Sequence, residues 1–354
     1  MSHINNILAT KLSYRFCRKK IQMLPSIQFI VQECCENLKI KEPKILFCES
    51  LTKDFQAFDL RNTLYFIYDS CLMETLYLYN SIIFSGLVES DIDKLFYKLF
   101  GEELVIKKDI TSSMYFVGKY TNMCFSFDNN KFTNTKVREY LSMQNYFLIG
   151  HELTHLSLKE SESVGIPKQY VNYILAAMTT FAEQDIAANK KNDFFEYASY
   201  FLDNPPESLN DYSNKLSCSK KFMDFVEECY CDHIGISLLL GYYEKAKVSL
   251  KAIAGTLNCL IMLESIRDIL RDGIMFIKDS TKKVTRTLYF SILRTKLLLC
   301  TIEASKLDTA SVLDSIHKYC KITSRLMHFV QNLPSGEAFA STFNIKLHQH
   351  SQND

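Results

Sequence analysis

The sequence predicts an α+β protein that is predominantly helical and has a small sheet near its N-terminus. Two short runs, Ile45–Glu49 and Thr63–Asp69, are rich in branched and aromatic residues and are expected to be strands. Two longer segments, at about 140–158 and 222–240, place apolar side chains along one helix face. Helices then dominate to about residue 332. A chain of 354 residues can bury a sizeable core.

The N-terminal part is expected to alternate helices with these strands. Residues 5–38 are predicted to form two helices that Pro25 separates, because proline interrupts a helix. Residues 71–106 are predicted to form two more helices. Ser113–Tyr120 and Met123–Asp128 are predicted to pair as a hairpin, since both are rich in aromatic and branched residues.

The C-terminal part is expected to be almost entirely helical. Residues 168–201 are predicted to be a helical insertion, and the turn residues throughout 203–217 predict a loop. After Pro334 the sequence turns polar and disorder is expected. The expected organisation is an N-terminal region of helices and sheet (1–140), a helical region with the candidate site (141–333) and the polar tail (334–354).

The charge balance argues against a general nucleic-acid binder. Lysine and arginine number 41 and acidic residues 40, so the net charge is +1. The locally basic stretch from Lys11 to Lys20 is expected to be a solvated helix face. We therefore expect a protein or peptide as the partner, with no nucleic acid; the oligomeric state is left open.

Cysteine content and hydropathy indicate a cytoplasmic protein. Twelve cysteines without a recognisable signal peptide are typical of a reducing compartment, where they pack as small buried hydrophobic residues. No run reaches the roughly 18 consecutive apolar residues that a transmembrane helix needs. The sequence therefore predicts a cytoplasmic protein with no membrane span.

The run His151-Glu152-Leu153-Thr154-His155 is the most informative motif. On a helix, residues four apart project from one face, so His151 and His155 can both face one metal ion. Glu152 lies beside the first histidine, where its carboxylate can take a proton from a metal-bound water. The H-E-x-x-H pattern is typical of zinc sites in peptidases. The small residue Gly150 just before the first histidine is a further feature that favours this interpretation.

A second predicted helix, Phe222–Leu240, carries carboxylates that complete such a site. Glu228 and Asp232 are four residues apart and share a helix face. A catalytic zinc takes three protein ligands, and His, His and Glu form a known set. Glu228 is the predicted third ligand. Asp232 is the predicted partner of a ligating histidine, most naturally His151, because such histidines bond a carboxylate through their other ring nitrogen.

Several other residues are rival candidates for the ligand set. Cys229 and Cys231 lie about 200° apart on a helix and cannot share a metal there, so buried packing is expected. His233 is turned about 100° from Asp232 and off the face of Glu228. The remaining alternatives lack a suitable partner or position. They are Glu160, Glu162, Glu183, Asp185, His348 and His350.

The two motifs together resemble the hallmark of the gluzincin zinc metallopeptidases, in which H-E-x-x-H is followed by a helix with E-x-x-x-D. The small Cys231 before Asp232 is most similar to the branch of the CAAX proteases and HtpX. The gap from His155 to Glu228 is 228 − 155 = 73 residues, which resembles branches with helical insertions. The resemblance covers roughly residues 45–300. It implies a zincin-like fold, one Zn²⁺ and peptide hydrolysis.

Further points of similarity extend the resemblance. The segment Phe55–Tyr68 resembles the N-A-F segment and strand that precede the active-site helix in that branch, with Gln56 in place of the usual Asn. The general build is also similar to Lit-type phage-exclusion peptidases. The lack of a membrane span departs from the CAAX and HtpX enzymes and points to a soluble substrate. No glycine and third histidine follow His155 at the metzincin offsets.

The resemblance also suggests where a stabiliser of the developing oxyanion lies. Ser280–Arg286 falls where the HtpX-like branch has Ser-Thr-His-Pro followed by Arg, although the His-Pro is missing here. Arg286 is the predicted stabiliser, since a positioned donor helps the metal hold negative charge. Tyr289 is the second choice. A purely structural ion pair of Arg286 is the alternative.

Two classes of function fit these motifs. The first is an active zinc endopeptidase that acts on a cytoplasmic protein or peptide. The second is a regulator or scaffold that keeps a zincin fold without turnover, in a stress or phage-defence system. All three ligands and the glutamate base are present, which favours the enzyme.

Overall fold

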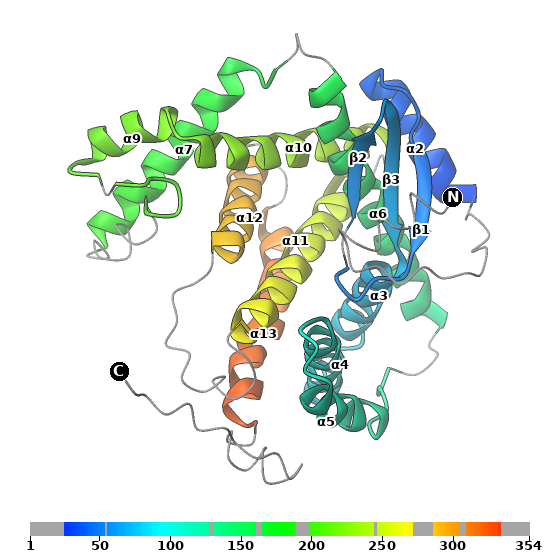
Figure 1. Ribbon diagram of the computed structural model, residues 1–354. Coiled ribbons are helices and arrows are strands. Elements are labelled where there is room, and N and C mark those ends of the chain that lie inside the picture. The colour runs from blue at the N-terminus through cyan, green and yellow to red at the C-terminus, as the bar shows by residue number, and fades with distance from the viewer. Residues whose placement is uncertain are drawn as a thin grey trace.

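A small sheet and a set of helices make up the computed structural model of the chain, shown in Figure 1. The predominantly helical α+β class predicted from the sequence is confirmed. The structure describes residues 25–53, 55–127, 131–160, 165–188, 198–204, 206–243, 246–271, 286–304 and 309–333. The basic stretch from Lys11 to Lys20, the first predicted helix and the tail after Pro334 lie outside the described residues.

The sheet has three strands in the order β1-β3-β2. Central β3 (Thr63–Asp69) pairs in parallel with β1 (Lys44–Cys48) and antiparallel with β2 (Gln56–Leu60). The strands predicted at 45–49 and 63–69 are present, and β2 was missed. The turn that joins β2 to β3 is Arg61-Asn62. Both residues have left-handed backbone conformations, with φ of 54° and 61°. The usual glycine of such turns is absent, which hid the hairpin.

The helices α2 (Pro25–Leu38), α3 (Ser70–Phe84) and α4 (Glu89–Ile106) lie near their predicted positions. The hairpin predicted over 113–128 is wrong, because α5 (Ile110–Thr121) is a helix that packs antiparallel to α4. Asp109 caps it by accepting a hydrogen bond from the Ser112 amide. The ring of Phe116 stacks on that of Phe100, 5.4 Å between centroids. Packing against α4 therefore overrides the strand propensity of this aromatic segment.

The largest hydrophobic core gathers side chains from α2, the sheet, α3, α4 and the helices that follow. The long α6 (Lys131–Glu160) lies against α10 (Lys220–Tyr242), α3 and α2. Its predicted stripe is buried: Tyr146, Ile149, Leu153 and Leu156 are at most 1% exposed. The domain boundary expected at residue 140 falls inside α6, and one core includes residues from both sides of it.

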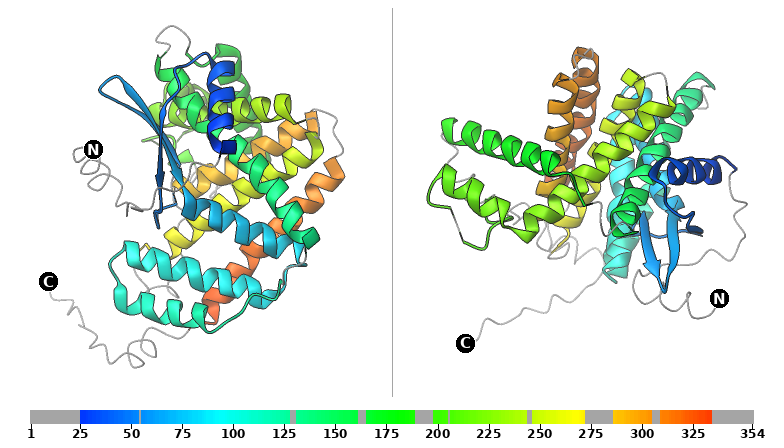
Figure 2. Two further views of the ribbon diagram at one scale, coloured as in Figure 1. Left: turned by 90° about the vertical axis from the view of Figure 1, so that its right-hand side faces the viewer. Right: turned by 90° about the horizontal axis from the view of Figure 1, so that it is seen from above.

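A second hydrophobic cluster lies to one side, where α7 (Lys168–Ala187) and α9 (Leu209–Ser217) stand out from the rest (Figures 1 and 2). It also includes residues of α10 and α12 (Arg286–Ala304). The loop predicted over 203–217 is in part wrong, since α9 occupies its second half. Ser208 caps this helix, and Tyr212 and Leu216, four residues apart, are buried in the cluster. The turn residues before Leu209 that predicted a loop therefore precede and cap the first turn of α9.

The helix α11 (Ala246–Ile269) crosses the middle of the molecule and packs on α12, α6 and α13 (Thr309–Gln331). Over Lys247–Ile269 it is long and apolar enough to cross a membrane, contrary to the expectation that no segment is. Of its most apolar window, 78% is buried inside the protein. The apolar composition of α11 is therefore explained by its place in the core.

Candidate metal centre

The candidate site forms where α6 crosses α10, and two glycines allow that crossing. A Cβ at Gly235 would lie 3.0 Å from the carbonyl oxygen of Phe147 and 3.2 Å from the amide nitrogen of His151. A Cβ at Gly150 would lie 3.3 Å from the Cα of Gly235. The two backbones therefore touch beside the first histidine. This close approach brings the carboxylates on α10 within reach of the histidines on α6.

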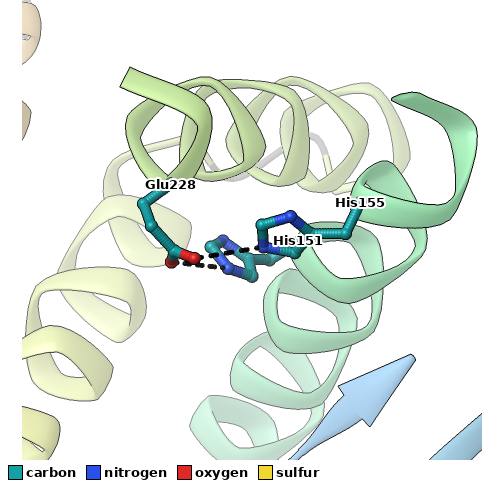
Figure 3. A group of neighbouring side chains, drawn as sticks. All are labelled: His151, His155 and Glu228. Atoms are coloured by element: carbon teal, nitrogen blue, oxygen red, sulfur yellow. Dashed lines mark ion pairs between the residues drawn. The ribbon is translucent and has the colours of Figure 1, made fainter. Parts of the chain in front are cut away.

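Figure 3 shows the three predicted ligands facing one another from these two helices. One ligand atom from each of His151, His155 and Glu228 lies within 4.8 Å of the others. The carboxylate of Glu228 faces both rings, with Oε2 3.4 Å from Nε2 of His151 and Oε1 3.4 Å from Nε2 of His155. Across the described ranges, no other group of histidine, cysteine and acidic residues has this geometry. The donor set fits one metal ion.

Each histidine turns its other ring nitrogen to a second carboxylate of α10. Nδ1 of His151 lies 2.9 Å from Oδ1 of Asp232, and Nδ1 of His155 lies 2.8 Å from Oε1 of Glu227. Both rings thereby direct Nε2 toward Glu228. Burial lowers the pKa of His151, but hydrogen bonds to Asp232 and Glu228 outweigh it and raise that pKa to about 10. A metal ion would replace that proton, because a ligating imidazole is neutral.

Arg294 on α12 ties the carboxylates of α10 together. Its guanidinium donates to both oxygens of Asp232, each at 2.7 Å, and to Oε2 of Glu228 at 3.1 Å. Burial alone would raise the pKa of Asp232, but Arg294 and His151 outweigh it and hold the pKa below its usual value. Glu228 has a lowered pKa for similar reasons, with the two histidines contributing. Both side chains are therefore carboxylates at neutral pH.

Glu152 lies between the histidines and the edge of the sheet. Its Oε1 is 4.0 Å from Nε2 of His151, and its Oε2 accepts a hydrogen bond from the amide of Ala57 in β2 at 3.1 Å. Burial raises the pKa of Glu152, and the nearby histidines partly oppose this. A carboxylate with a raised pKa beside a metal site is suited to accept a proton.

Two hollows meet at this site. An open groove runs between the β2 edge and the crossing helices. It is lined by Phe55, Gln56, Ala57, Glu152, His155, Lys159, Glu227 and Glu228. A second pocket lies on the other side of Glu152 and Glu228, and it has both apolar walls and charged ones, the latter including Lys53, Glu264 and Arg267. Its walls include Leu72, Phe147, Leu148, Leu260 and Leu263. The metal centre is thus reachable from the surface.

The other candidates from the sequence lie elsewhere. The side chain of Arg286 lies outside the described residues, and Tyr289 packs on Tyr200 and Phe201 in the second cluster. The remaining rivals take no part in the metal group. Cys229 and Cys231 are buried, and His233 contacts the ring of Tyr170. Glu160, Glu183 and Asp185 do not belong to the group that could hold a metal. Glu162, His348 and His350 lie outside the described residues.

Two residues of the site were missed from the sequence. Arg294 stands two turns beyond Arg286 on the same helix, and its signal is a charged residue within the largely apolar segment Leu288–Leu299, which also contains Lys296. Glu227 precedes the predicted ligand Glu228 directly, and nothing in the spacing distinguished it from a solvated charge.

Comparison with known proteins gave no match, whether to family models, to curated proteins or to solved structures. What this chain does is therefore inferred from its own side chains.

Proposed function

We propose that this protein is a zinc-dependent endopeptidase. The observation that supports it is the set of His151, His155 and Glu228 within 4.8 Å of one another, with Glu152 beside them. Two histidines and a glutamate are a known ligand set of catalytic zinc, which keeps one position open for water or substrate. When bound there, zinc would polarise a carbonyl group and make its water a strong nucleophile at neutral pH.

Glu152 would act as the general base and then as the general acid. Its carboxylate takes the proton of the attacking water, and its raised pKa favours that transfer near neutral pH. The same proton can pass to the leaving amine when the peptide bond breaks. Ala57 holds the carboxylate through its amide, so the base keeps its orientation toward the groove.

Among the cations that line the two hollows, Arg294 is the one that donates hydrogen bonds to two carboxylates of α10, Glu228 and Asp232. Its NH1 reaches Glu228, so the guanidinium lies beside the ligand set. It lines the second pocket together with His151 and Glu152. A fixed cation there stabilises negative charge that develops on the substrate carbonyl oxygen.

The groove fits an extended peptide. β2 is an edge strand. The turn at Arg61-Asn62 sets the register, so the backbone N–H and C=O groups of Gln56, Phe58 and Leu60 point toward β3. The backbone groups of Ala57 and Asp59 then point away from the sheet, as the bond from Ala57 to Glu152 shows. Because the amide of Ala57 is bonded to Glu152, a substrate strand would pair through the Ala57 carbonyl and the backbone groups of Asp59, and would lay its peptide bond across the candidate metal centre. A side chain beside that bond would enter the second pocket, which has both apolar and charged walls.

The experiment is a comparison of the parent with Glu152→Gln in cells. New protein N-termini are mapped across the proteome after induction of each form. We expect cleavage products with the parent and none with Glu152→Gln, because the amide cannot accept the proton of water. Glu183→Gln, an exposed change on α7, is the matched control and should cleave like the parent. Equal cleavage by the parent and by Glu152→Gln would contradict the proposal.

A further inference from the structure

We infer that Glu227 is a positioning residue that orients His155 for metal binding, so that both histidines of the site are held by carboxylates of one helix. The inference rests on the proposed metal centre and goes beyond it, because Glu227 is no ligand. The sequence predicts one such carboxylate, Asp232, and leaves His155 without a partner.

The geometry at His155 places its ring between two successive side chains of α10. Nδ1 lies 2.8 Å from Oε1 of Glu227, and Nε2 lies 3.4 Å from Oε1 of Glu228. Neighbouring residues on a helix point about 100° apart, so two adjacent carboxylates can approach the two edges of one ring. With Glu227 on Nδ1, that nitrogen carries the proton and Nε2 is left as the metal ligand.

The arrangement at His151 repeats this pattern with Asp232 in the corresponding place. There Nδ1 faces Asp232 at 2.9 Å and Nε2 faces Glu228 at 3.4 Å. Glu228 thus faces the Nε2 atoms of both rings, while Glu227 and Asp232 face the Nδ1 atoms. A carboxylate behind an imidazole fixes its tautomer and raises its basicity. The common pattern argues that the contact of Glu227 serves metal binding.

The surroundings of the two carboxylates differ, and this makes the inference testable. Asp232 is 7% exposed and is also held by Arg294, so its loss would disturb the fold as well. The side chain of Glu227 is 39% exposed and lines the open groove. Its replacement removes the contact with His155 and leaves a surface that water can fill. The effect of Glu227 on the metal can therefore be separated from its effect on stability.

The test is the zinc affinity of Glu227→Ala and Glu227→Gln, measured by competition with a chelator at one pH. We expect Glu227→Ala to bind zinc about 10–100-fold more weakly than the parent, the usual loss for such partners. Glu227→Gln should recover much of this loss, because its amide oxygen still accepts from Nδ1 of His155. The thermal midpoint of the metal-free protein should be the same in all three, as a surface change predicts.

Glu183→Gln is the matched control, since it removes an exposed carboxylate that does not line the groove. A zinc affinity of Glu227→Ala within twofold of the parent would overturn the inference and leave the metal centre intact. A parent that binds no zinc would instead overturn the proposed function, and this inference with it. Loss of affinity that follows a fall in the thermal midpoint would also contradict a positioning role.

Discussion

Arg294 bonds to two acidic side chains of α10, and its own side chain is only 15% exposed. The two parallel bonds to Asp232 use the planar fork of the guanidinium, a geometry that lysine cannot reproduce. Asp232 in turn orients His151. Arg294 therefore stabilises the charge of the carboxylate on which the first histidine depends.

Replacement of Arg294 by Ala should destabilise the protein strongly. Removal of one partner from a buried ion pair leaves an uncompensated charge and typically costs about 3–5 kcal/mol. We expect a fall of that size in the free energy of unfolding, measured by urea denaturation of the metal-free protein. Arg294→Lys should recover part of it, since the charge is kept and the fork is lost. A fall below about 1 kcal/mol for Arg294→Ala would show that this contact contributes little.

Asp232→Ala should weaken zinc binding, because His151 loses the acceptor of its Nδ1 proton. The expected change is about 10–100-fold in zinc affinity, measured by chelator competition. Asp314→Ala is a suitable control, since Asp314 is an exposed partner of Lys318 on α13. Unchanged affinity in Asp232→Ala would remove the role of Asp232 and would weaken the assignment of Glu228, which depends on the same helix register.

The crossing of α6 and α10 sets the distance between the histidines and their carboxylates. Gly235 faces the backbone of α6 at a point where a side chain has no room, whereas a Cβ at Gly241 on the same helix would meet nothing within 4 Å. The first glycine is thus required by packing, and the second is not. The ligand geometry follows from the closeness of the two backbones.

Gly235→Ala should therefore push the helices apart. The added methyl group would lie 3.0 Å from the carbonyl oxygen of Phe147. Because that oxygen belongs to the backbone, one of the two helices has to shift. Overpacking of this kind typically costs about 1–3 kcal/mol, and we expect weaker zinc binding with it. Gly241→Ala should be neutral or slightly stabilising, because alanine favours a helix. Equal thermal midpoints for the two variants would contradict the close crossing.

The sequence predicted these two helices well and the elements around them less well. The period of Tyr146, Ile149, Leu153 and Leu156 is that of a buried helix face, so α6 was recognisable without its neighbours. α5 was mistaken for a hairpin, because its helical form depends on the contact of Phe116 with α4. Such tertiary contacts are not encoded in a local pattern.

The candidate site also combines residues that a local pattern predicts with residues that only tertiary contacts reveal. His151, Glu152, His155, Glu228 and Asp232 follow from spacing within two helices, since helix geometry alone fixes which side chains share a face. Arg294 comes from a third helix, and its place beside Asp232 depends on how α12 packs. The sequence therefore missed the contact from a third helix, and it also missed Glu227 on α10, because spacing alone does not separate a partner of His155 from a solvated charge.

At the scale of the whole molecule, the candidate metal centre lies between two hydrophobic clusters. The first half of α10 packs in the second cluster through Phe222, Phe225 and Val226, and its second half reaches the main core through Leu239. The acidic residues that surround the histidines lie in between. The two clusters hold α10 from both ends, so the site is fixed by packing that extends beyond its own residues.

Cysteine reactivity reports on this packing across the chain. Burial raises the pKa of the Cys34 and Cys259 thiols to about 12, so at pH 8 both stay protonated as well as covered. Cys124 and Cys218 are exposed. We expect brief treatment of the native protein with iodoacetamide to label Cys124 and Cys218 and to spare Cys34 and Cys259, as read by peptide mass spectrometry. Labelling of all four at similar rates would contradict the described core.

If His151, His155 and Glu228 bind one zinc ion, the purified protein should contain it, and its metal content is the first quantity to measure. Zinc per chain is measured for the parent and for the His151→Ala/His155→Ala double variant after dialysis against a weak chelator. Near-stoichiometric zinc in the parent and almost none in the double variant are the predicted results, because one remaining ligand holds zinc poorly. Near-stoichiometric zinc in the double variant, or none in the parent, would contradict the account.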